Sequence, residues 1–501
     1  MILYLNKIAR TEKKYVSVSR PRRFGKSLLI STIKAYFEGK KDLFEGLAIS
    51  KMEHKWEVYP VVRLDLSSAG DALNQDQLYQ KLGSILRESE AAFDLQEQDL
   101  LPGERLNVLI QSVYKKTGKP VVLLVDEYDA PLLGALYEER EALFKIIVKE
   151  LFSSVKKLDP YLHFTFLSGI TKFSQLSIFS TLNNLNDISL SDKYATLCGF
   201  TKENIERFFA DDISKMAEQN LKSEQDVSNE LRQRYDGYHF SPSCIDVYNP
   251  YSVLRAFSEQ KMSDYWFSSG TPTMLYNTLR KFNTHIYDID GIAVMASVFN
   301  QPEDSANNAV PIFYQSGYLT IKAYSKEYDT YILSIPNAEV RTGLMEKLLP
   351  IAYGKNPIES QNAAIRFKAA LLADNINEAV NVLKGFFASI PYPETGRAAN
   401  TPEFRESYYQ RLFYVVFSFM NVQIYTEVMN SEGRTDAIMY IADKIYIVEA
   451  KLDAASAREA VNQIEEKGYA TRFCGTGRTV LKLGLNFSSK TRTISDWILC
   501  E

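Results

Sequence analysis

A short run near the start of the chain carries groups suited to binding phosphate: residues 20–27, Arg-Pro-Arg-Arg-Phe-Gly-Lys-Ser. If a helix begins after Gly25, its first backbone N–H groups would surround phosphate oxygens. The Lys26 ammonium would neutralise the β- and γ-phosphates of a nucleotide, and the Ser27 hydroxyl would ligate Mg²⁺. The general pattern has a first glycine where this chain has Arg20, so the match is incomplete. A surface Gly-Lys-Ser turn is the alternative, and a second element is needed to decide.

Two acids at the end of an apolar run supply that element. Asp126 and Glu127 follow residues 121–125, Val-Val-Leu-Leu-Val, which predict a strand buried on both faces of a parallel sheet. Asp126 would hold Mg²⁺ beside the loop, and Glu127 would polarise the attacking water. A solvated acidic strand end is the alternative. The two elements together favour ATP binding, with ATP hydrolysis as a further expectation.

The arginines that precede the triplet have two explanations. Arg20, Arg22 and Arg23 would stabilise transferred phosphate or bind nucleic acid, but pairing of one or more of them with Asp126, Glu127 or Asp129 explains them equally well. The residues predicted to bind ATP and its Mg²⁺ are therefore Arg22, Arg23, Gly25, Lys26, Ser27 and Asp126, with Ser27 and Asp126 as the metal ligands.

A second set of residues with metal chemistry lies near the end of the chain. Strands are predicted at 435–441 and 444–450 with a two-residue turn between them, so Asp436 is expected opposite Glu449. Directly opposed side chains have Cβ atoms about 4.5–5.5 Å apart, and like charges there repel unless a cation lies between them. Lys451 follows Glu449 by two residues and therefore faces the same side of the sheet.

This face of the predicted hairpin suits phosphodiester hydrolysis. Two carboxylates and a backbone carbonyl match Mg²⁺ or Mn²⁺, which prefer oxygen ligands. The metal would polarise the scissile phosphate, and Lys451 would orient or deprotonate the attacking water. A solvated hairpin with a Glu–Lys ion pair is the alternative. Against it, Glu449 lies within the otherwise apolar run YIVEAK, where a charge without a partner is costly.

The elements that must position these residues alternate along the first part of the chain. Strands are predicted at 15–19, 59–66, 120–126 and 162–168, separated by segments with helical spacing. Such alternation predicts an α/β fold with a parallel sheet layered by helices. Later segments are predicted as short helices with turns at 235–330, antiparallel helices at 339–390, a linker at 389–403, and helices at 403–420 and 455–470 around a dense run of strands.

The composition excludes several classes of protein. Hydrophobic residues make up 46% and charged residues 24%, and the net charge of −4 excludes a globally basic nucleic-acid binder. The four cysteines contain no CxxC pair and the four histidines lack metal-ligand spacing, so neither a disulfide framework nor a zinc site is expected. No apolar run reaches the ~18 residues of a membrane span, and no signal peptide is apparent. We therefore expect a cytoplasmic protein with no membrane partner.

Several motifs together resemble one known family. They are SRPRRFGKSLL, VVLLVDEYDAPL, LSGITKFSQLSIFSTLNNLNDIS, RYDGYHF, YNPYSVL, SSGTPTML, YQSGYLTI and IPNAEVR. Over nearly its whole length the chain resembles the AAA-ATPase-like proteins of bacteria that carry a C-terminal PD-(D/E)XK nuclease-like domain. The resemblance implies a P-loop NTPase domain with Walker A and Walker B elements at 1–200, a helical lid and accessory region at 201–390, and a restriction-endonuclease-like α/β domain at 396–501.

The resemblance also carries expectations for the N-terminal domain. Arginine is the usual residue at position 20 in this family. The family usually has some tens of residues before the first strand, so this chain is expected to begin late. A residue that senses the γ-phosphate is expected after the strand at 162–168, with Thr171 and Asn184 as candidates and a plain loop as the alternative.

In the C-terminal domain the resemblance assigns roles to individual residues. Asp436, Glu449 and Lys451 match the PD-(D/E)XK signature, and Gln463 and Tyr469 match a Gln-x5-Tyr element expected to reach the same site from a helix. Glu406 resembles the acid of the first helix, Glu403 is a rival for that role, and Glu427 matches a family acid without an assigned role. The predicted catalytic residues are Glu127, Asp436, Glu449, Lys451 and Gln463, and the predicted metal ligands of this domain are Asp436, Glu449 and Glu406.

Three functions fit these features. The first is an ATPase that gates or remodels, joined to a metal-dependent nuclease that acts on DNA or RNA. The second is an ATP-switched module that binds nucleic acid or a protein without cleavage. The third is a signalling or defence scaffold that forms homo-oligomers on ATP, with arginines that reach a neighbour's phosphate. Cleavage with Mg²⁺ or Mn²⁺ separates the first from the second, and molecular size with and without ATP identifies the third.

Overall fold

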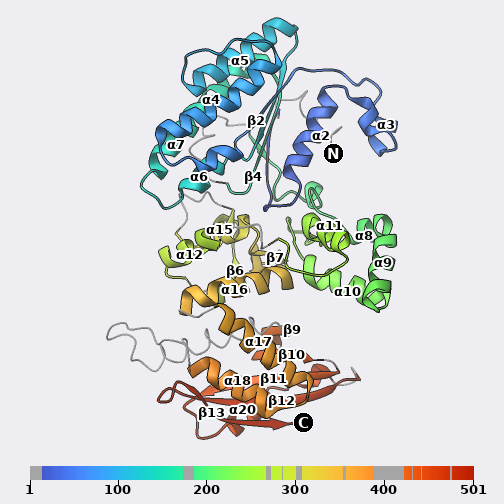
Figure 1. Ribbon diagram of the computed structural model, residues 1–501, viewed down its shortest axis with the longest axis vertical. Coiled ribbons are helices and arrows are strands. Elements are labelled where there is room, and N and C mark those ends of the chain that lie inside the picture. The colour runs from blue at the N-terminus through green and yellow to red at the C-terminus, as the bar shows by residue number, and fades with distance from the viewer. Residues whose placement is uncertain are drawn as a thin grey trace. The chain divides into compact units, whose positions relative to one another are not determined.

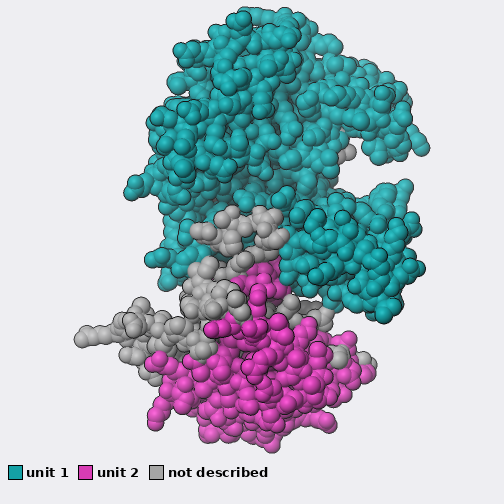
Figure 2. Space-filling model, in the orientation of Figure 1, with its two compact units in different colours: residues 1–284, 288–338 teal, residues 285–287, 339–501 magenta. Residues whose placement is uncertain are grey.

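The computed structural model describes most of the chain and divides it into two compact units (Figures 1 and 2). The described residues are 14–172, 185–266, 272–284, 286–300, 307–353, 357–388, 423–430, 433–441, 443–473 and 477–501. The first unit comprises residues 1–284 and 288–338, and the second comprises 285–287 and 339–501. The three-part division expected from the sequence stays a prediction. None of the helices within the described ranges has the length and apolar character needed to cross a membrane.

A five-stranded parallel sheet forms the centre of the first unit. Its strand order is β2-β3-β4-β1-β5, and all of its pairs are parallel. The strands are β1 Tyr15–Ser19, β2 Val61–Asp65, β3 Val121–Asp126, β4 Leu162–Gly169 and β5 Asn186–Asp187. Every residue of β3 is buried, as its continuous apolar run predicts. Because the carboxyl ends of parallel strands meet at one edge, the loop after β1 and the acids after β3 lie at the same edge, on either side of β4.

Helices cover both faces of this sheet, which confirms the predicted α/β fold (Figure 1). They are α2 Lys26–Phe37, α3 Ala48–Met52, α4 Gln75–Ala92, α5 Pro102–Thr117, α6 Ala130–Ala135 and α7 Glu141–Ser153. Their ends follow from local chemistry. The Asn74 side chain accepts a hydrogen bond from the backbone N–H of Gln77 and caps α4, and Gly118 ends α5 with a φ of 65° that favours glycine.

The rest of the first unit contains helices and a small sheet. The helices are α8 Lys202–Phe208, α9 Ala210–Asn220, α10 Glu224–Tyr235, α11 Pro250–Glu259, α12 Pro272–Lys281, α14 Ala296–Phe299 and α15 Val310–Gln315. The short helix α13, Ile286–Ile289, is divided between the two units. The strands β6 Ile292–Val294, β7 Thr320–Ser325 and β8 Thr330–Ser334 form an antiparallel sheet in the order β6-β8-β7. The sequence predicted only short helices and turns here, because strands this short carry too little alternation to be recognised.

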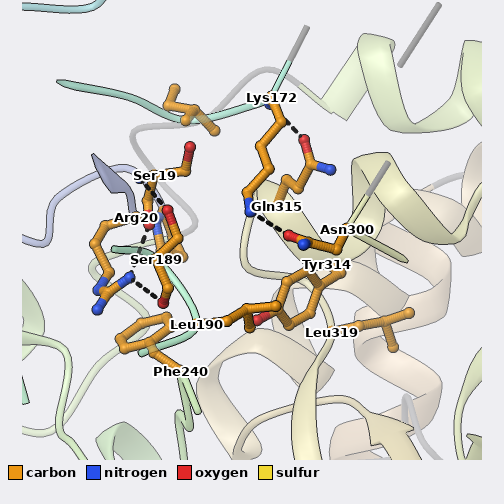
Figure 3. A pocket seen from close by; sticks show the side chains of 12 residues that line it. Ser19, Arg20, Lys172, Ser189, Leu190, Phe240, Asn300, Tyr314, Gln315 and Leu319 are labelled. Atoms are coloured by element: carbon orange, nitrogen blue, oxygen red, sulfur yellow. Dashed lines mark hydrogen bonds between the residues drawn. The ribbon is translucent and has the colours of Figure 1, made fainter. Parts of the chain in front are cut away.

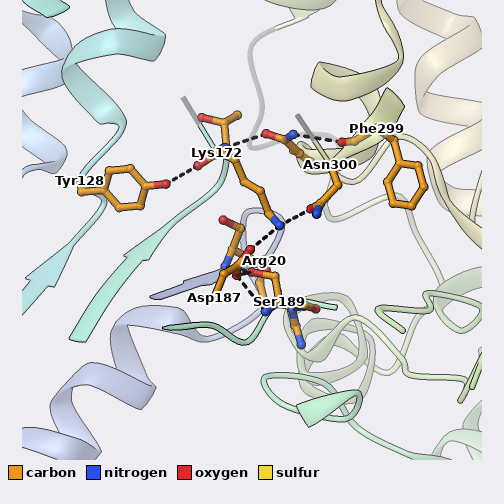
Figure 4. Close-up of polar contacts among 10 residues, drawn as sticks. Arg20, Tyr128, Lys172, Asp187, Ser189, Phe299 and Asn300 are labelled. Atoms are coloured by element: carbon orange, nitrogen blue, oxygen red, sulfur yellow. Dashed lines mark hydrogen bonds and ion pairs between the residues drawn. The ribbon is translucent and has the colours of Figure 1, made fainter. Parts of the chain in front are cut away.

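A buried ion pair ties the end of β4 to β5 and to the helices α14 and α15 (Figure 4). Lys172 is only 2% exposed, and its Nζ lies 2.5 Å from Asp187 Oδ2 and donates to Asn300 Oδ1. Its backbone N–H donates to Gln315 Oε1 at 2.7 Å. Burial alone would raise the pKa of Asp187, but the Lys172 ammonium outweighs it and holds that pKa below its ordinary value.

The second unit contains three helices followed by a mixed five-stranded sheet. The helices are α16 Ala338–Tyr353, α17 Pro357–Leu372 and α18 Ile376–Ala388. The strands are β9 Gln423–Asn430, β10 Gly433–Ile441, β11 Lys444–Leu452, β12 Thr479–Ser488 and β13 Thr493–Cys500, in the order β13-β12-β11-β10-β9. Only β11 and β12 pair in parallel among the described strands of this sheet, and α20, Arg458–Glu466, connects them. The predicted helix at 403–420 lies outside the described residues.

The helix α20 packs directly on the sheet at Gly484. A Cβ at Gly484 would lie 2.5 Å from the carbonyl oxygen of Ala457 and 2.9 Å from Val461 Cγ2. Gly484 pairs with Glu449 in the register of β11 and β12. The missing side chain therefore lets α20 approach the sheet beside Glu449.

We predict that Gly484→Ala destabilises the second unit by about 1–3 kcal/mol, because the new methyl group must displace backbone atoms of α20. The matched control is Gly385→Ala in α18, where a Cβ meets no atom within 4 Å. There alanine should be neutral or stabilising by up to ~1 kcal/mol, since it favours a helix. Denaturant unfolding measures both variants, and equal effects would contradict the packing described.

We predict that Lys172→Met destabilises the first unit by about 3–5 kcal/mol, because Asp187 loses its cation in a buried setting. Lys202→Met is the control, since Lys202 is 68% exposed and its Glu206 pair contributes a few tenths of a kcal/mol at most. A carboxylate with a lowered pKa stabilises the fold above its ordinary pKa, and this contribution is lost as the pH falls through the lowered value. The difference between wild type and Lys172→Met should therefore shrink on acidification below about pH 4, as measured by urea unfolding at several pH values.

Candidate functional site

The 20–27 loop leads from β1 into α2 through two residues with left-handed backbone. Arg23 has a φ of 66° and Gly25 a φ of 79°. A Cβ at Gly25 would meet no atom within 4 Å, so glycine is favoured there by backbone conformation rather than by space. Helix α2 begins at Lys26, and no side chain within the described ranges caps its first turn. Its first N–H groups are therefore available to an anion.

Lys26 is buried against its own loop. It is 6% exposed, and its Nζ donates to the carbonyl oxygens of Arg20 and Pro21 at 2.9 and 3.0 Å. Burial lowers the pKa of Lys26, and the opposing charges of Asp129, Glu127 and Asp126 act in the other direction. The lysine therefore lies within electrostatic reach of the acids that follow β3. Ser27, the predicted Mg²⁺ ligand beside it, is exposed.

Asp126 has the environment expected of a metal ligand. It is fully buried, and its Oδ1 accepts a 2.5 Å hydrogen bond from the Ser168 hydroxyl at the end of β4. Its Oδ2 lies 3.7 Å from Arg63 Nη2 and has no hydrogen bond among the described residues. A buried carboxylate oxygen with spare acceptor capacity suits Mg²⁺. Within the ranges that the structure describes, no group of three His, Cys, Asp or Glu side chains forms a ready-made metal cluster.

Glu127 differs from Asp126 in its backbone conformation and in its burial. It has a φ of 50° and is half-buried. Burial raises the pKa of Glu127 above its ordinary value; Asp129, Asp126 and Asp65 add to this effect, and Lys26 opposes it. A carboxylate with a raised pKa beside a phosphate site suits general-base chemistry.

Tyr128 and Asp129 bind the end of β4 to the end of β3. The Tyr128 hydroxyl donates to the Thr171 carbonyl at 2.7 Å (Figure 4). Asp129 Oδ2 accepts from the backbone N–H groups of Ile170 and Thr171 at 3.0 and 2.6 Å, and from the Thr171 hydroxyl at 2.7 Å. Burial raises the pKa of Asp129. The Thr171 hydroxyl is thus bonded to Asp129, and the rival sensor candidate, Asn184, lies outside the described residues.

The sequence predicted that Arg20 contacts phosphate or nucleic acid, or that it pairs with an acid of 126–129. The structure shows neither role for Arg20. Its guanidinium is 1% exposed and lies 4.3 Å from the centre of the Phe240 ring. It donates to four backbone carbonyl oxygens, those of Ser19, Ser189, Tyr194 and Leu197. Four neutral acceptors satisfy the buried cation, so it pairs with no acid of 126–129 and does not face solvent. Arg22 and Arg23 are exposed, and the Arg23 guanidinium lies 4.9 Å from the Tyr251 ring.

A small cavity of about 20 Å³ lies next to Ser19 and Arg20 (Figure 3). Lys172, Asn300, Gln315 and other residues of the first unit line it. A cavity of this size holds about one water molecule and is far too small for a nucleotide. Asn300 and Gln315, which line this cavity, could not be recognised from the sequence, because their partner Lys172 is more than a hundred positions away in the chain.

In the second unit, Glu449, Lys451 and Gln463 come together as predicted. Glu449 is 2% exposed, and its Oε1 accepts a hydrogen bond from Gln463 Nε2 of α20. Lys451 Nζ donates to Gln463 Oε1 and lies 4.0 Å from Glu449 Oε1. The amide of Gln463 therefore bridges the carboxylate and the ammonium. Tyr469 packs in a hydrophobic cluster with Ile464 and Phe473.

The hairpin register agrees with the sequence expectation. Ile441 pairs with Lys444 and Ala437 with Val448, and the same register continued by one pair places Asp436 opposite Glu449. The side chain of Asp436 lies outside the described residues, as do Glu403 and Glu406 and the side chain of Glu427. Convergence of their carboxylates with Glu449 therefore stays a prediction.

Comparisons with known proteins agree with this two-part organisation. A family model described as predicted AAA-ATPase matches residues 2–179, and a model of the PD-(D/E)XK nuclease superfamily matches residues 404–497. An uncharacterized protein in the vnfD 5' region of Azotobacter chroococcum mcd 1 is 31% identical over 490 residues, which cover 96% of this chain and 91% of that protein.

One solved structure is more distant. The Aeropyrum pernix ORC2 protein in ADPNP–ADP complexes aligns with a TM-score of 0.28 and 11% identity over 70% of this chain and 94% of that chain, and a similarity at this level carries no argument. The two family models and the relative, which is 31% identical over nearly the whole chain, are the comparisons that bear on the family. The chain belongs to the family of AAA-ATPase-like proteins that carry a C-terminal PD-(D/E)XK nuclease-like domain.

Proposed function

We propose that this protein binds and hydrolyses ATP at the 20–27 loop and uses ATP to control a metal-dependent nuclease site at Glu449. One observation carries the proposal: each unit has a lysine within electrostatic reach of a buried carboxylate in the second half of a strand. Lys26 interacts electrostatically with Asp129, Glu127 and Asp126 at the end of β3, and Lys451 Nζ lies 4.0 Å from Glu449 Oε1 in β11. Both phosphate transfer and phosphodiester cleavage need a cation and an acid in such an arrangement.

At the first site the loop and the acids would divide the work. The N–H groups of the loop and of α2 would surround the phosphates, and Lys26 would exchange its two carbonyl acceptors for phosphate oxygens. Ser27 and Asp126 would hold Mg²⁺, which supplies charge neutralisation at the phosphates when it is bound. Glu127 would accept the proton of the attacking water. Exposed Arg22 and Arg23 would contact the nucleotide or, in a homo-oligomer, the nucleotide of a neighbouring copy.

At the second site the residues would bind a metal and position a water. Glu449 and Asp436, with Glu406 as a further candidate, would hold Mg²⁺ or Mn²⁺, which polarises the scissile phosphate of DNA or RNA when it is bound. Lys451 would orient or deprotonate the attacking water. Gln463 holds Lys451 beside Glu449 through its two amide contacts. The substrate class rests on the chemistry of this donor set.

We predict that Lys26→Ala abolishes ATP binding and that Glu127→Gln keeps binding but lowers the hydrolysis rate by ~10²-fold or more, because the base is lost. Lys34→Ala, which removes a half-buried lysine from the same helix, should change neither. Calorimetric titration and phosphate release measure the two quantities. Hydrolysis at the wild-type rate in Glu127→Gln would rule out the role of Glu127.

The pH dependence follows from the raised pKa of Glu127. A general base works only when it is ionised, so the hydrolysis rate should fall on acidification at a pH above the ordinary glutamate value of 4.5. In Glu127→Gln this acidic limb should disappear from the residual rate. A wild-type limb at or below pH 4.5 would contradict the assignment.

We predict that Glu449→Gln and Lys451→Ala each lower Mn²⁺-dependent cleavage by ~10²-fold or more, while ATP binding is unchanged. Lys482→Ala is the control, since Lys482 pairs with Glu465 on the same domain. The assay is a panel of single-stranded, double-stranded and branched DNA and of RNA, with Mn²⁺ or Mg²⁺, with and without ATP. Nucleic-acid binding that survives chelation, without cleavage under any condition, would instead identify an ATP-switched binding module.

A further inference from the structure

The side chains of the 20–27 loop pack against residues that come from much later in the chain. Phe24 is 1% exposed and makes edge contacts with the rings of Tyr238 and Phe240, at 4.9 and 5.2 Å between ring centres. Pro21 fills the space that a side chain at Gly317 would need, since a Cβ there would lie 2.5 Å from Pro21 Cβ. The motifs RYDGYHF and YQSGYLTI, which contain these partners, therefore form one wall of the loop.

Trp266 reaches the backbone of the loop itself. Its indole Nε1 donates a 3.0 Å hydrogen bond to the carbonyl oxygen of Arg22, 244 positions away in the chain. Trp266 is 5% exposed, and its ring packs edge-on against Tyr318 with ring centres 5.0 Å apart. The indole ring is thus packed against Tyr318. Trp266 belongs to the part of the first unit that follows residue 200, here called its accessory part.

This hydrogen bond controls which way the loop presents its N–H groups. In a planar trans peptide the C=O of one residue and the N–H of the next point in opposite directions. Fixing the Arg22 carbonyl on the side of Trp266 therefore directs the Arg23 N–H away from Trp266. Arg23 has left-handed backbone, and neighbouring N–H groups around such a residue form the concave surface that binds anions.

The other carbonyls of the loop depend on Lys26. Those of Arg20 and Pro21 accept from the Lys26 ammonium, which must release them in order to reach a phosphate. The bond from Trp266 has no such conflict, because Trp266 contributes no group to the phosphates.

We infer that Trp266 is a positioning residue that holds the 20–27 loop in its anion-binding conformation, so that nucleotide affinity depends on the accessory part of the first unit. The inference rests on the proposed ATP binding and adds to it. Trp266 lies next to the loop backbone, so its fluorescence should also report nucleotide binding.

The test compares Trp266→Phe with Trp56→Phe. Trp56 is a matched control because its indole also donates a 3.0 Å hydrogen bond to a backbone carbonyl, that of Glu53, which is not part of the loop. Both variants keep an aromatic ring and lose one N–H donor. We expect ATP affinity to fall roughly fivefold to tenfold in Trp266→Phe, the loss typical of one hydrogen bond, and to stay at the wild-type value in Trp56→Phe. Thermal melts record how much stability each variant loses, since Trp266 is buried and Trp56 is half-buried.

The outcomes distinguish this inference from the proposed function. If the wild type binds no ATP, the proposed function fails. If the wild type binds ATP and Trp266→Phe binds it equally well, the positioning role is overturned. Equal losses of affinity in both variants would overturn it too, since they would reflect stability alone.

A second measurement covers the case in which Trp266→Phe does not fold. The chain has three tryptophans, so in the double variant Trp56→Phe/Trp497→Phe only Trp266 remains to fluoresce. Its emission should change on titration with ATP and saturate at the calorimetric affinity, and Lys26→Ala in the same background should abolish the change. No change in emission at saturating ATP would overturn the inference.

Discussion

Burying a carboxylate in a strand is the constraint on which both sites depend. A buried charge is tolerated only with hydrogen bonds and a cation nearby. Asp126 meets this need with the Ser168 hydroxyl and distant Arg63, and Glu449 meets it with the Gln463 amide and Lys451. In each case the protein groups leave the cation at some distance from the carboxylate. Among the described residues, the nearest cations lie 3.7 Å from Asp126 Oδ2 and 4.0 Å from Glu449 Oε1.

The strand order of the first unit places the 20–27 loop and the buried Asp126 at the same edge of the sheet. Because β4 lies between β1 and β3, the end of β4 lies between the loop after β1 and the acids at the end of β3. The end of β4 must therefore connect them, and it is polar. Ser168 orients Asp126, and Asp129 holds residues 170–171 by three hydrogen bonds. The Thr171 hydroxyl is occupied in this structural role.

Sequence predicts what depends on local pattern and misses what depends on distant contacts. The apolar run at 121–125 was enough to predict a parallel buried strand, and the two-residue turn was enough to predict the register of β10 and β11. The same reasoning predicted the meeting of Glu449 and Lys451, since they share one strand. It failed for Arg20, whose acceptors at 189–197 follow from the tertiary fold, and it gave no sign of Trp266. No local period encodes a contact across 244 residues.

Arg20 stands where the general phosphate-loop pattern has its first glycine, and this replacement explains why the loop depends on distant contacts. A glycine at position 20 would give the backbone its freedom locally, whereas arginine fixes it through the carbonyl of Ser19 and through three carbonyls and a ring from elsewhere in the fold. Trp266 does the same for the peptide after Arg22. A loop that owes its shape to long-range contacts cannot keep that shape when those contacts are removed. The shape of the loop therefore depends on the first unit beyond its parallel sheet: residues 1–200 alone would keep the carbonyl acceptors of Arg20 and the partners of the acids, but would lack Phe240 and Trp266.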